Sequence, residues 1–252
     1  MAIGPIRMGL AICPGAMPPT ESTSAAATSG LGTWDWSDHL TVAQREKARR
    51  VLNVSVAAMG LVVTAPLMAL IAIAIRLTSR GPVIYSQTRI GIDRRKYLGG
   101  NHRREVDLGG QPFTIYKFRT MAQGHGAEER WASPTDARIT RMGRVLRKYR
   151  LDELPQLVNV LRGDMNVVGP RPEQPAIFAS LREQIPAYPV RQRVRPGITG
   201  WAQINQGYDT CLEDVRRKVT YDLEYVERQS MAEDLKIMLK TVPTVAFKLG
   251  GW

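Results

Sequence analysis

The feature that most constrains this chain is one apolar segment, residues 51–75, with the sequence VLNVSVAAMGLVVTAPLMALIAIAI. Its 25 consecutive residues carry no charge. A helix of this length reaches roughly 37 Å, which exceeds the hydrocarbon thickness of a bilayer. Buried helices of soluble proteins seldom stay uncharged for so long, so the segment predicts a helix that enters a membrane.

Basic residues flank this segment on both sides. They are Arg45, Lys47, Arg49 and Arg50 before it, and Arg76, Arg80, Arg89, Arg94 and Arg95 after it. Because Lys and Arg favour the cytoplasmic side of a membrane, neither end is suited to the outside. Pro66 lacks an N–H, and Thr64 can hydrogen-bond loosened backbone, so a sharp bend is possible. We predict a re-entrant helix broken at Pro66, with a kinked single span as the alternative.

Residues 1–40 form a separate unit. Pro, Ser, Thr, Ala and Gly dominate residues 13–33 without apolar periodicity, which is typical of a flexible tail. No secretory signal is evident, and the two cysteines and three histidines have no disulfide or zinc spacing. We therefore expect a reducing, cytoplasmic setting, with a tail (1–40), a basic flank and membrane helix (41–80), and a cytoplasmic domain (81–252).

The cytoplasmic domain mixes strands and helices. Two segments, 81–91 and 111–121, place β-branched and aromatic residues between Gly and Pro, and predict a small β-hairpin around a loop at 93–110. Helical periodicity begins near residue 136, and residues 231–249 predict an amphipathic helix broken near Pro243. That last helix fits either the membrane surface or the soluble core. The expected class is α+β, mostly helical, in a monotopic membrane protein with amphipathic interfacial helices.

Charge narrows the choice of partner. The formal net charge is +12, from 35 Lys and Arg against 23 Asp and Glu. Nucleic acid, a lipid surface and a phosphorylated substrate all fit such an excess. One basic stretch contains no acid and comprises Arg138, Arg141, Arg144, Arg147, Lys148 and Arg150.

Two adjacent carboxylates follow this basic stretch, in LDELPQLVNVLRGDMNVVGPRP (151–172). Pro155 is tolerated in a first helical turn, so Asp152 and Glu153 are expected at or just before a helix N-terminus. Asp152 is then equally well read as an ordinary N-cap. Arg171 lies between two prolines, which would pre-orient its guanidinium for phosphate. An ionised Asp beside a bound phosphate is what an aspartyl-phosphate mechanism requires.

Six motifs occur in order: an apolar segment with a central Pro, GPVIYSQTRIG, KFRTM, TRMGRVLRKYRLDELPQLVNVLRGDM, VVGPRPE and RPGITGWAQ. With them the chain resembles the bacterial sugar transferases, the monotopic phosphoglycosyl transferase family, in their short form without a preceding multi-span domain. The likeness runs from about Lys47 to Lys248. It implies an enzyme on the cytoplasmic face of the inner membrane. The implied reaction transfers sugar 1-phosphate from a UDP-sugar to polyprenol phosphate (undecaprenyl phosphate), releases UMP, and starts exopolysaccharide, capsule or glycoconjugate assembly.

The resemblance also implies roles for individual residues. Asp152 would be the nucleophile that carries a covalent phosphosugar and a ligand of the Mg²⁺ cofactor, and Glu153 would assist the acceptor phosphate. The residues that match substrate- or phosphate-binding positions of the family are Lys117, Arg119, Arg147, Arg171, Arg195 and Asp222. From pattern alone, Lys117, Arg119 and Arg147 are a solvated basic surface, Asp222 is an exposed helix acid, and the glycines beside Arg195 mark a turn.

Some features depart from the family pattern or stay open. Asn53 stands where the family usually has an acid, and neither the length of the 93–110 loop nor the GGW ending has a functional account. Residues 218–226, KVTYDLEYV, resemble members acting on UDP-glucose or UDP-galactose more than on N-acetylated sugars. Oligomeric state and pathway are left open. The rival function is a basic membrane-associated module that binds nucleic acid or anionic lipid without catalysis; nucleic acid is the least favoured partner, because no nucleic-acid motif is present.

Overall fold

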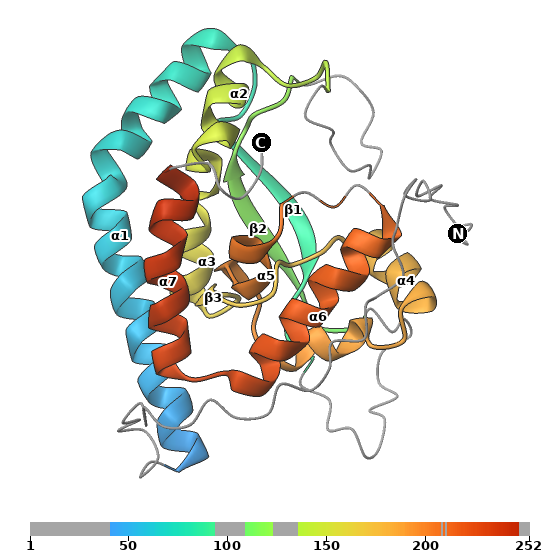
Figure 1. Ribbon diagram of the computed structural model, residues 1–252. Coiled ribbons are helices and arrows are strands. Elements are labelled where there is room, and N and C mark those ends of the chain that lie inside the picture. Colours follow the sequence, from blue (N-terminus) through green and yellow to red (C-terminus); the bar gives the residue numbers. More distant parts are fainter. Residues whose placement is uncertain (1–40, 94–108, 123–135, 208, 210, 247–252) are drawn as a thin grey trace.

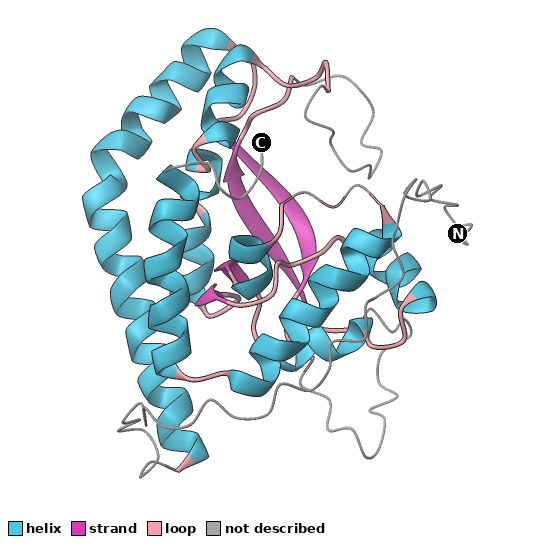
Figure 2. Cartoon of the chain, in the orientation of Figure 1, coloured by secondary structure: helices cyan, strands magenta, loops and turns pink. Residues whose placement is uncertain are grey.

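The computed structural model describes residues 41–93, 109–122, 136–207, 209 and 211–246 (Figure 1). The predicted tail, most of the 93–110 loop and the GGW ending lie outside these residues. Helices make up most of the described chain, as predicted (Figure 2). The elements, with η for 3-10 turns, are α1 (Val42–Thr78), β1 (Ile84–Ile90), β2 (Pro112–Phe118), α2 (Arg141–Lys148), η2 (Leu151–Glu153), α3 (Gln156–Arg162), β3 (Asn166–Val168), α4 (Pro175–Gln184), η3 (Tyr188–Arg193), β4 (Gly197–Thr199), α5 (Trp201–Asn205), α6 (Leu212–Arg228) and α7 (Met231–Ala246).

Helix α1 contains the predicted membrane segment and begins nine residues before it, at a capping box formed by Thr41 and Gln44. It continues through Pro66, so the predicted break is not seen. Figure 1 instead shows α1 bending partway along its length. The Thr64 hydroxyl donates to the Gly60 carbonyl at 2.7 Å, which is the backbone contact expected of a threonine beside a proline bend.

The two sides of α1 differ sharply. Ala57, Ile71 and Ile75 are buried against α3, β2 and α2. The other side exposes large apolar side chains, and within the described residues α1 is the one helix long and apolar enough to cross a membrane. An exposed apolar surface of this size is costly in water. The exposed residues are Val51, Met59, Val62, Val63, Leu67, Leu70, Ile73 and Leu77.

The basic flank before the apolar segment forms contacts within the protein. Arg49 pairs with Asp234 of α7 at 2.8 Å and donates to the Tyr225 hydroxyl at 3.0 Å. Arg50 donates to the last carbonyls of α3, which lack partners inside their own helix. Asn53 is fully buried and accepts from the Val167 amide at 2.6 Å. These contacts fix the N-terminal half of α1 against α3, β3, α6 and α7.

The predicted β-hairpin is confirmed, because β1 and β2 pair antiparallel with Gln87 opposite Ile115. A second, parallel pair was not predicted: β3 and β4 join the VVGPRP and RPGITG segments. The backbones approach closely there. A Cβ on Gly169 would lie 2.3 Å from the Arg195 carbonyl, and one on Gly197 would lie 2.1 Å from the Gly169 nitrogen. Glycine is therefore required at both positions.

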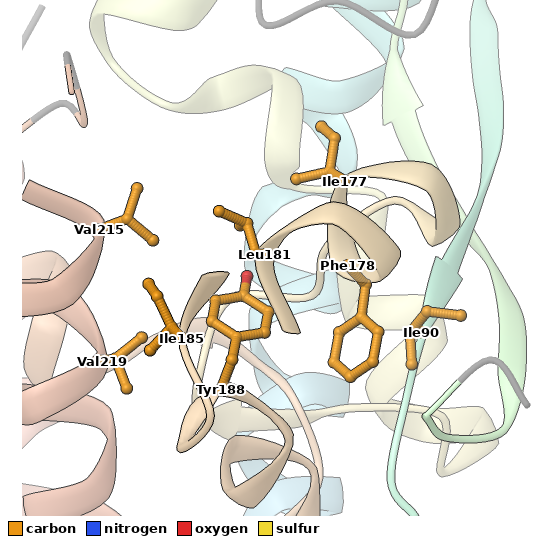
Figure 3. Close-up of a cluster of buried hydrophobic side chains, with 8 residues drawn as sticks. All are labelled: Ile90, Ile177, Phe178, Leu181, Ile185, Tyr188, Val215 and Val219. Carbon is orange, nitrogen blue, oxygen red and sulfur yellow. The ribbon is translucent and has the colours of Figure 1, made fainter. Parts of the chain in front are cut away.

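The main hydrophobic cluster joins α4 and η3 to β1 and α6 (Figure 3). It comprises Ile90, Ile177, Phe178, Leu181, Ile185, Tyr188, Val215 and Val219. Helix α7 packs on α1, α5, β3 and β4 and runs through Pro243 without the predicted break. Ile237 is fully buried, whereas Leu239 and Val242 are 73% and 67% exposed, so α7 has one face in the core and one apolar face outside it.

Candidate active site

The two carboxylates lie in a tight turn between α2 and α3. Arg150, which begins this turn, has φ of 53° and is the one residue other than glycine with positive φ in the described chain. Such a conformation costs on the order of 1–3 kcal/mol outside glycine. It ends α2 and starts η2, which contains Asp152 and Glu153. Both residues are buried, with 8% and 5% of their whole-residue surface exposed.

Asp152 is not a helix N-cap. The N-cap of α3 is Pro155, and no side chain caps this helix. Among the described residues, the Asp152 carboxylate makes no hydrogen bond and no ion pair closer than 4 Å. The expected position just before the α3 N-terminus is confirmed, but the ordinary capping role is wrong. A buried carboxylate without a hydrogen-bonding partner is unusual and requires an explanation.

Glu153 has several partners. Its Oε1 atom lies 3.0 Å from Lys117 Nζ and 2.7 Å from a terminal nitrogen of Arg171, and its Oε2 atom lies 3.9 Å from Arg150. Arg171 is 32% exposed and Lys117 is 17% exposed, compared with 7% for Glu153, so the cations retain the contact with solvent that an incoming anion needs. We call Asp152, Glu153, Lys117 and Arg171 the dyad cluster.

The surroundings shift the pKa values of the two acids of the dyad cluster in opposite directions. Burial raises the pKa of Asp152, and the negative charge of Glu153 raises it further. Burial alone would also raise the pKa of Glu153, but Arg171, Lys117 and Arg150 outweigh burial and hold this pKa well below its usual range. Burial lowers the pKa of Lys117, and Glu153 opposes that shift. Glu153 is therefore a fixed anion at neutral pH, while Asp152 is the more basic and more nucleophilic carboxylate when ionised.

Three other predicted residues lie at different places. Arg147 donates through Nε to the Thr120 hydroxyl at 2.9 Å, and its charge influences Asp152. Arg119 is buried, with its guanidinium on the carbonyls of Ser79 and Arg80, just beyond α1. Arg195 is partly buried between η3 and β4. Arg119 thus holds the C-terminal end of α1, and its predicted phosphate contact stays a prediction, as does that of Arg195.

Asp222 is buried and is not an exposed helix acid. Its Oδ2 atom lies 2.6 Å from Arg191 Nε, and the two side chains are 2% and 0% exposed. A terminal nitrogen of the same Arg191 donates to the Arg171 carbonyl at 3.1 Å. The structure therefore connects Asp222 to the dyad cluster through Arg191, which sequence reasoning did not select.

Further charged side chains, fully or partly buried, pair with one another near residues 171–173. Lys218 pairs with Glu173 at 2.9 Å and with Asp209 at 2.8 Å. Burial alone would raise the pKa of Glu173, but Lys218, Arg191 and Arg89 outweigh burial and lower it to about 2. No pattern pointed to this group, because its members are far apart in sequence. We call it the buried charge network: Arg89, Glu173, Arg191, Asp209, Lys218 and Asp222.

The carboxylates of the dyad cluster, Asp152 and Glu153, are the candidate ligands for Mg²⁺. The described residues contain no group of three His, Cys, Asp or Glu side chains that would hold a metal. Mg²⁺ does not require one, since it commonly binds one or two carboxylates together with water and substrate phosphates. Glu153 is already paired with cations, whereas the Asp152 carboxylate makes no hydrogen bond to any residue that the structure describes. Asp152 therefore fits an ion that takes its remaining ligands from a diphosphate and water.

The site thus combines a buried acid pair and neighbouring cations, in a chain that also has a long helix with an exposed apolar side. Comparison with known proteins identifies the family. Residues 44–248 match the family described as bacterial sugar transferase, and the chain belongs to that family.

Three relatives illustrate this membership. The chain is 42% identical over 200 residues to the UDP-glucose:undecaprenyl-phosphate glucose-1-phosphate transferase of Caulobacter vibrioides, covering 78% of this chain and 69% of that protein. It is 40% identical over 205 residues to the UDP-N-acetylgalactosamine-undecaprenyl-phosphate N-acetylgalactosaminephosphotransferase of Aeromonas hydrophila, covering 80% and 44%. It is 39% identical over 197 residues to the UDP-glucose:undecaprenyl-phosphate glucose-1-phosphate transferase of Escherichia coli, covering 77% and 39%. The chain thus spans less than half the length of the last two.

Proposed function

We propose that the chain transfers a sugar 1-phosphate from a UDP-sugar to polyprenol phosphate in the membrane, giving polyprenyl diphosphate sugar and UMP. The observation that carries this proposal is the asymmetry of the dyad cluster: Glu153 pairs directly with the cations, whereas Asp152 has no hydrogen bond or ion pair among the described residues. Membership in the bacterial sugar transferase family and the names of the relatives point to the same reaction class.

The proposed chemistry has two displacements at one phosphorus. A carboxylate oxygen of Asp152 attacks the phosphorus that bears the sugar, and the bond from this phosphorus to the oxygen bridging to the UMP phosphate breaks. UMP leaves with that oxygen and its electron pair, and an aspartyl-phosphosugar remains. An oxygen of polyprenol phosphate then attacks the same phosphorus and displaces the Asp152 carboxylate. Each step exchanges one P–O bond for another, so no oxidant or water is needed.

The remaining residues stabilise charge. Lys117 and Arg171 would contact the phosphate oxygens, where charge accumulates in both displacements. Glu153 is a poor base at neutral pH because its pKa is held low, so we assign it to orienting these two cations for the acceptor phosphate. A bound Mg²⁺ would add charge neutralisation on the diphosphate, with Asp152 as its protein ligand.

We place this reaction at the cytoplasmic face of the inner membrane. The exposed apolar side of α1 supports insertion, and the internal contacts of Arg49 and Arg50 support keeping the N-terminal end of α1 beside the cytoplasmic domain. Both ends of α1 would then face the cytoplasm, and α1 would be re-entrant through its bend. The donor class is a UDP-hexose, with UDP-glucose or UDP-galactose favoured over N-acetylated sugars, and the product would start exopolysaccharide, capsule or glycoconjugate assembly.

The test uses the purified full chain in lipid nanodiscs with a panel of UDP-sugars and no acceptor. We expect about one UMP per enzyme from the preferred donor and a matching increase in the intact protein mass. Asp152→Asn should show neither. Glu153→Gln should form the adduct but transfer it to polyprenol phosphate slowly, and exposed Glu227→Gln serves as the control. Adduct formation by Asp152→Asn would refute the assigned nucleophile, and DNA binding without UMP release would favour the rival binding module.

A further inference from the structure

Three consecutive residues after β3 are each held by a cation from a different element; Arg191 is fully buried, and Arg89 and Lys218 are partly buried. Arg191 of η3 donates to the Arg171 carbonyl at 3.1 Å, and Arg89 of β1 donates to the Pro172 carbonyl at 3.1 Å. Lys218 of α6 pairs with the Glu173 carboxylate at 2.9 Å. The backbone that carries Arg171 is therefore fixed from three sides, and of these three cations Arg191 is the one bonded to Arg171 itself.

Arg191 makes this contact with a guanidinium that has no exposed surface. Its Nε donates to Asp222 at 2.6 Å, and the guanidinium lies over the Tyr188 ring at 4.8 Å. Burial alone would lower the pKa of Arg191, but Asp222 keeps that pKa above its usual value. Burying two charges in this way is costly compared with apolar packing, and often adds nothing to stability. Such a pair therefore calls for a role other than stability.

The hydrophobic cluster of Figure 3 sets the geometry of the pair. Tyr188 of η3 and Val219 of α6 belong to this cluster, and Tyr188 is fully buried. Arg191 follows Tyr188 by three residues, and Asp222 follows Val219 by three residues along its helix. A helix turn carries residues three apart to the same side. The core that joins η3 to α6 thus brings Arg191 and Asp222 together.

We propose that Arg191 and Asp222 are positioning residues for Arg171. Asp222 orients Arg191, and Arg191 holds the Arg171 carbonyl, so that the Arg171 guanidinium meets Glu153 and, in turn, a substrate phosphate. Asp222 acts here through two other side chains and not by touching substrate, which differs from the role that its sequence position suggests. The inference rests on the proposed function of the dyad cluster.

The guanidinium is essential to this arrangement. Its Nε bonds Asp222 while a terminal nitrogen bonds the Arg171 carbonyl, so one planar group spans two acceptors. A lysine retains the charge but presents its donors from a single nitrogen on a flexible stem. Arg191→Lys should therefore keep Asp222 paired and release the Arg171 carbonyl.

The structure offers a matched control in a second buried Arg–Asp pair. Arg49 lies 2.8 Å from Asp234 and also bonds a tyrosine hydroxyl, but it joins α1 to α7 and does not contact Arg171. Arg49→Lys makes the same chemical change in a pair whose aspartate is equally buried, although its arginine is 12% exposed against 0% for Arg191. Any loss common to both variants reports general damage to the fold, and any loss specific to Arg191→Lys reports the connection to Arg171.

The experiment is a double-mutant cycle in nanodiscs with Arg191→Lys, Arg171→Ala and their combination, alongside Arg49→Lys. We expect Arg191→Lys to lower kcat by about 10- to 100-fold, with the donor KM changed less than about threefold. In the Arg171→Ala background the same change should have less than about a twofold effect. Equal effects in both backgrounds would overturn the proposal, as would an equal loss in Arg49→Lys.

A second readout does not need turnover. We expect Arg191→Lys to weaken binding of inorganic pyrophosphate about fivefold in the parent background and not in the Arg171→Ala background. Unchanged pyrophosphate affinity in Arg191→Lys would overturn the positioning role. If the parent protein releases UMP from none of the donors, the proposed function is wrong. The role of Arg191 is still decided in that case, because the pyrophosphate measurements do not depend on turnover.

Discussion

The dyad cluster and the buried charge network use the same residue types in opposite ways. In the network, each acid has a cation partner within 2.6 to 2.9 Å, as in Asp222 with Arg191 and Glu173 with Lys218. In the dyad cluster, Glu153 pairs with Lys117 and Arg171, while Asp152 has no cation within 4 Å in the described part of the chain. Ion pairs that satisfy every acid fix the backbone of the network. In the dyad cluster the cations pair with Glu153 alone, which leaves the Asp152 carboxylate able to react. The two clusters meet at Arg171, whose side chain belongs to one and whose carbonyl is held by the other.

The largest expected effect is on activity and stability: the dyad cluster should control catalysis, and the buried charge network should control the stability of the fold. Asp152→Asn should lower donor-dependent UMP release by at least about 10³-fold without lowering the melting temperature, since it removes a buried acid that has no partner. Glu173→Gln should lower the melting temperature by on the order of 10 °C, because breaking a buried pair costs about 3–5 kcal/mol. Its remaining folded protein should lose far less activity than Asp152→Asn does, because Glu173 reaches Arg171 only through the backbone.

Scanning fluorimetry and UMP release on the same preparations measure both quantities, with Glu227→Gln as the control on an exposed acid. A loss of stability in Asp152→Asn equal to that in Glu173→Gln would remove the distinction between the clusters.

The pH dependence of stability gives a smaller effect with a defined sign. Glu173 has a pKa lowered from 4.5 to about 2, so its pairing stabilises the fold above about pH 4.5. That contribution is lost as pH falls through about 2, and it amounts to at most about 3 kcal/mol. Melting curves of the parent and Glu173→Gln should therefore differ by a constant amount near neutral pH and converge under acid conditions. A difference that widened as pH fell would contradict this role of Glu173.

The sequence predicted the dyad cluster better than the network, for a physical reason. Asp152 and Glu153 are adjacent, and the motifs around Lys117 and Arg171 are local, so a pattern can find them. Arg191 and Asp222 are 31 residues apart and meet only because the hydrophobic cluster packs η3 on α6. A single sequence carries no signal for such a contact, and Asp222 alone resembles any acid on a helix surface.

In the fold, too, elements with a local sequence pattern were predicted and elements without one were missed. The apolar helix and the β1–β2 hairpin follow periodicity and composition, and both were predicted. The parallel β3–β4 pair joins two three-residue strands, which are too short for a periodic pattern to reveal. The predicted breaks at Pro66 and Pro243 are absent, because each helix tolerates its proline. Arg150 was assigned to a helical row, but it adopts the left-handed conformation that begins the turn of the dyad.

The smallest expected effect is on membrane binding by the basic stretch (residues 138–150). Some of its cations contact the protein interior and others are exposed on the surface. Arg147 and Arg150 face Thr120 and Glu153, whereas Arg141, Arg144 and Lys148 are exposed on α2 beside exposed Val145 and Tyr149. Helix α2 packs on the apolar α1 through Leu146, Ile71 and Ile75, so these cations would lie near lipid head groups if α1 is inserted.

Neutralising the exposed cations should therefore weaken attraction to an anionic bilayer. The triple variant Arg141→Gln, Arg144→Gln, Lys148→Gln should bind phosphatidylglycerol vesicles about tenfold or more weakly at low salt, since each cation near such a surface contributes about 1 kcal/mol. Binding to neutral phosphatidylcholine vesicles should not change, and added salt should reduce the difference. Vesicle flotation measures both, with Arg216→Gln, Arg217→Gln, Arg228→Gln on α6 as a control of equal charge. Equal losses in the two triple variants would mean that net charge matters and the position of α2 does not.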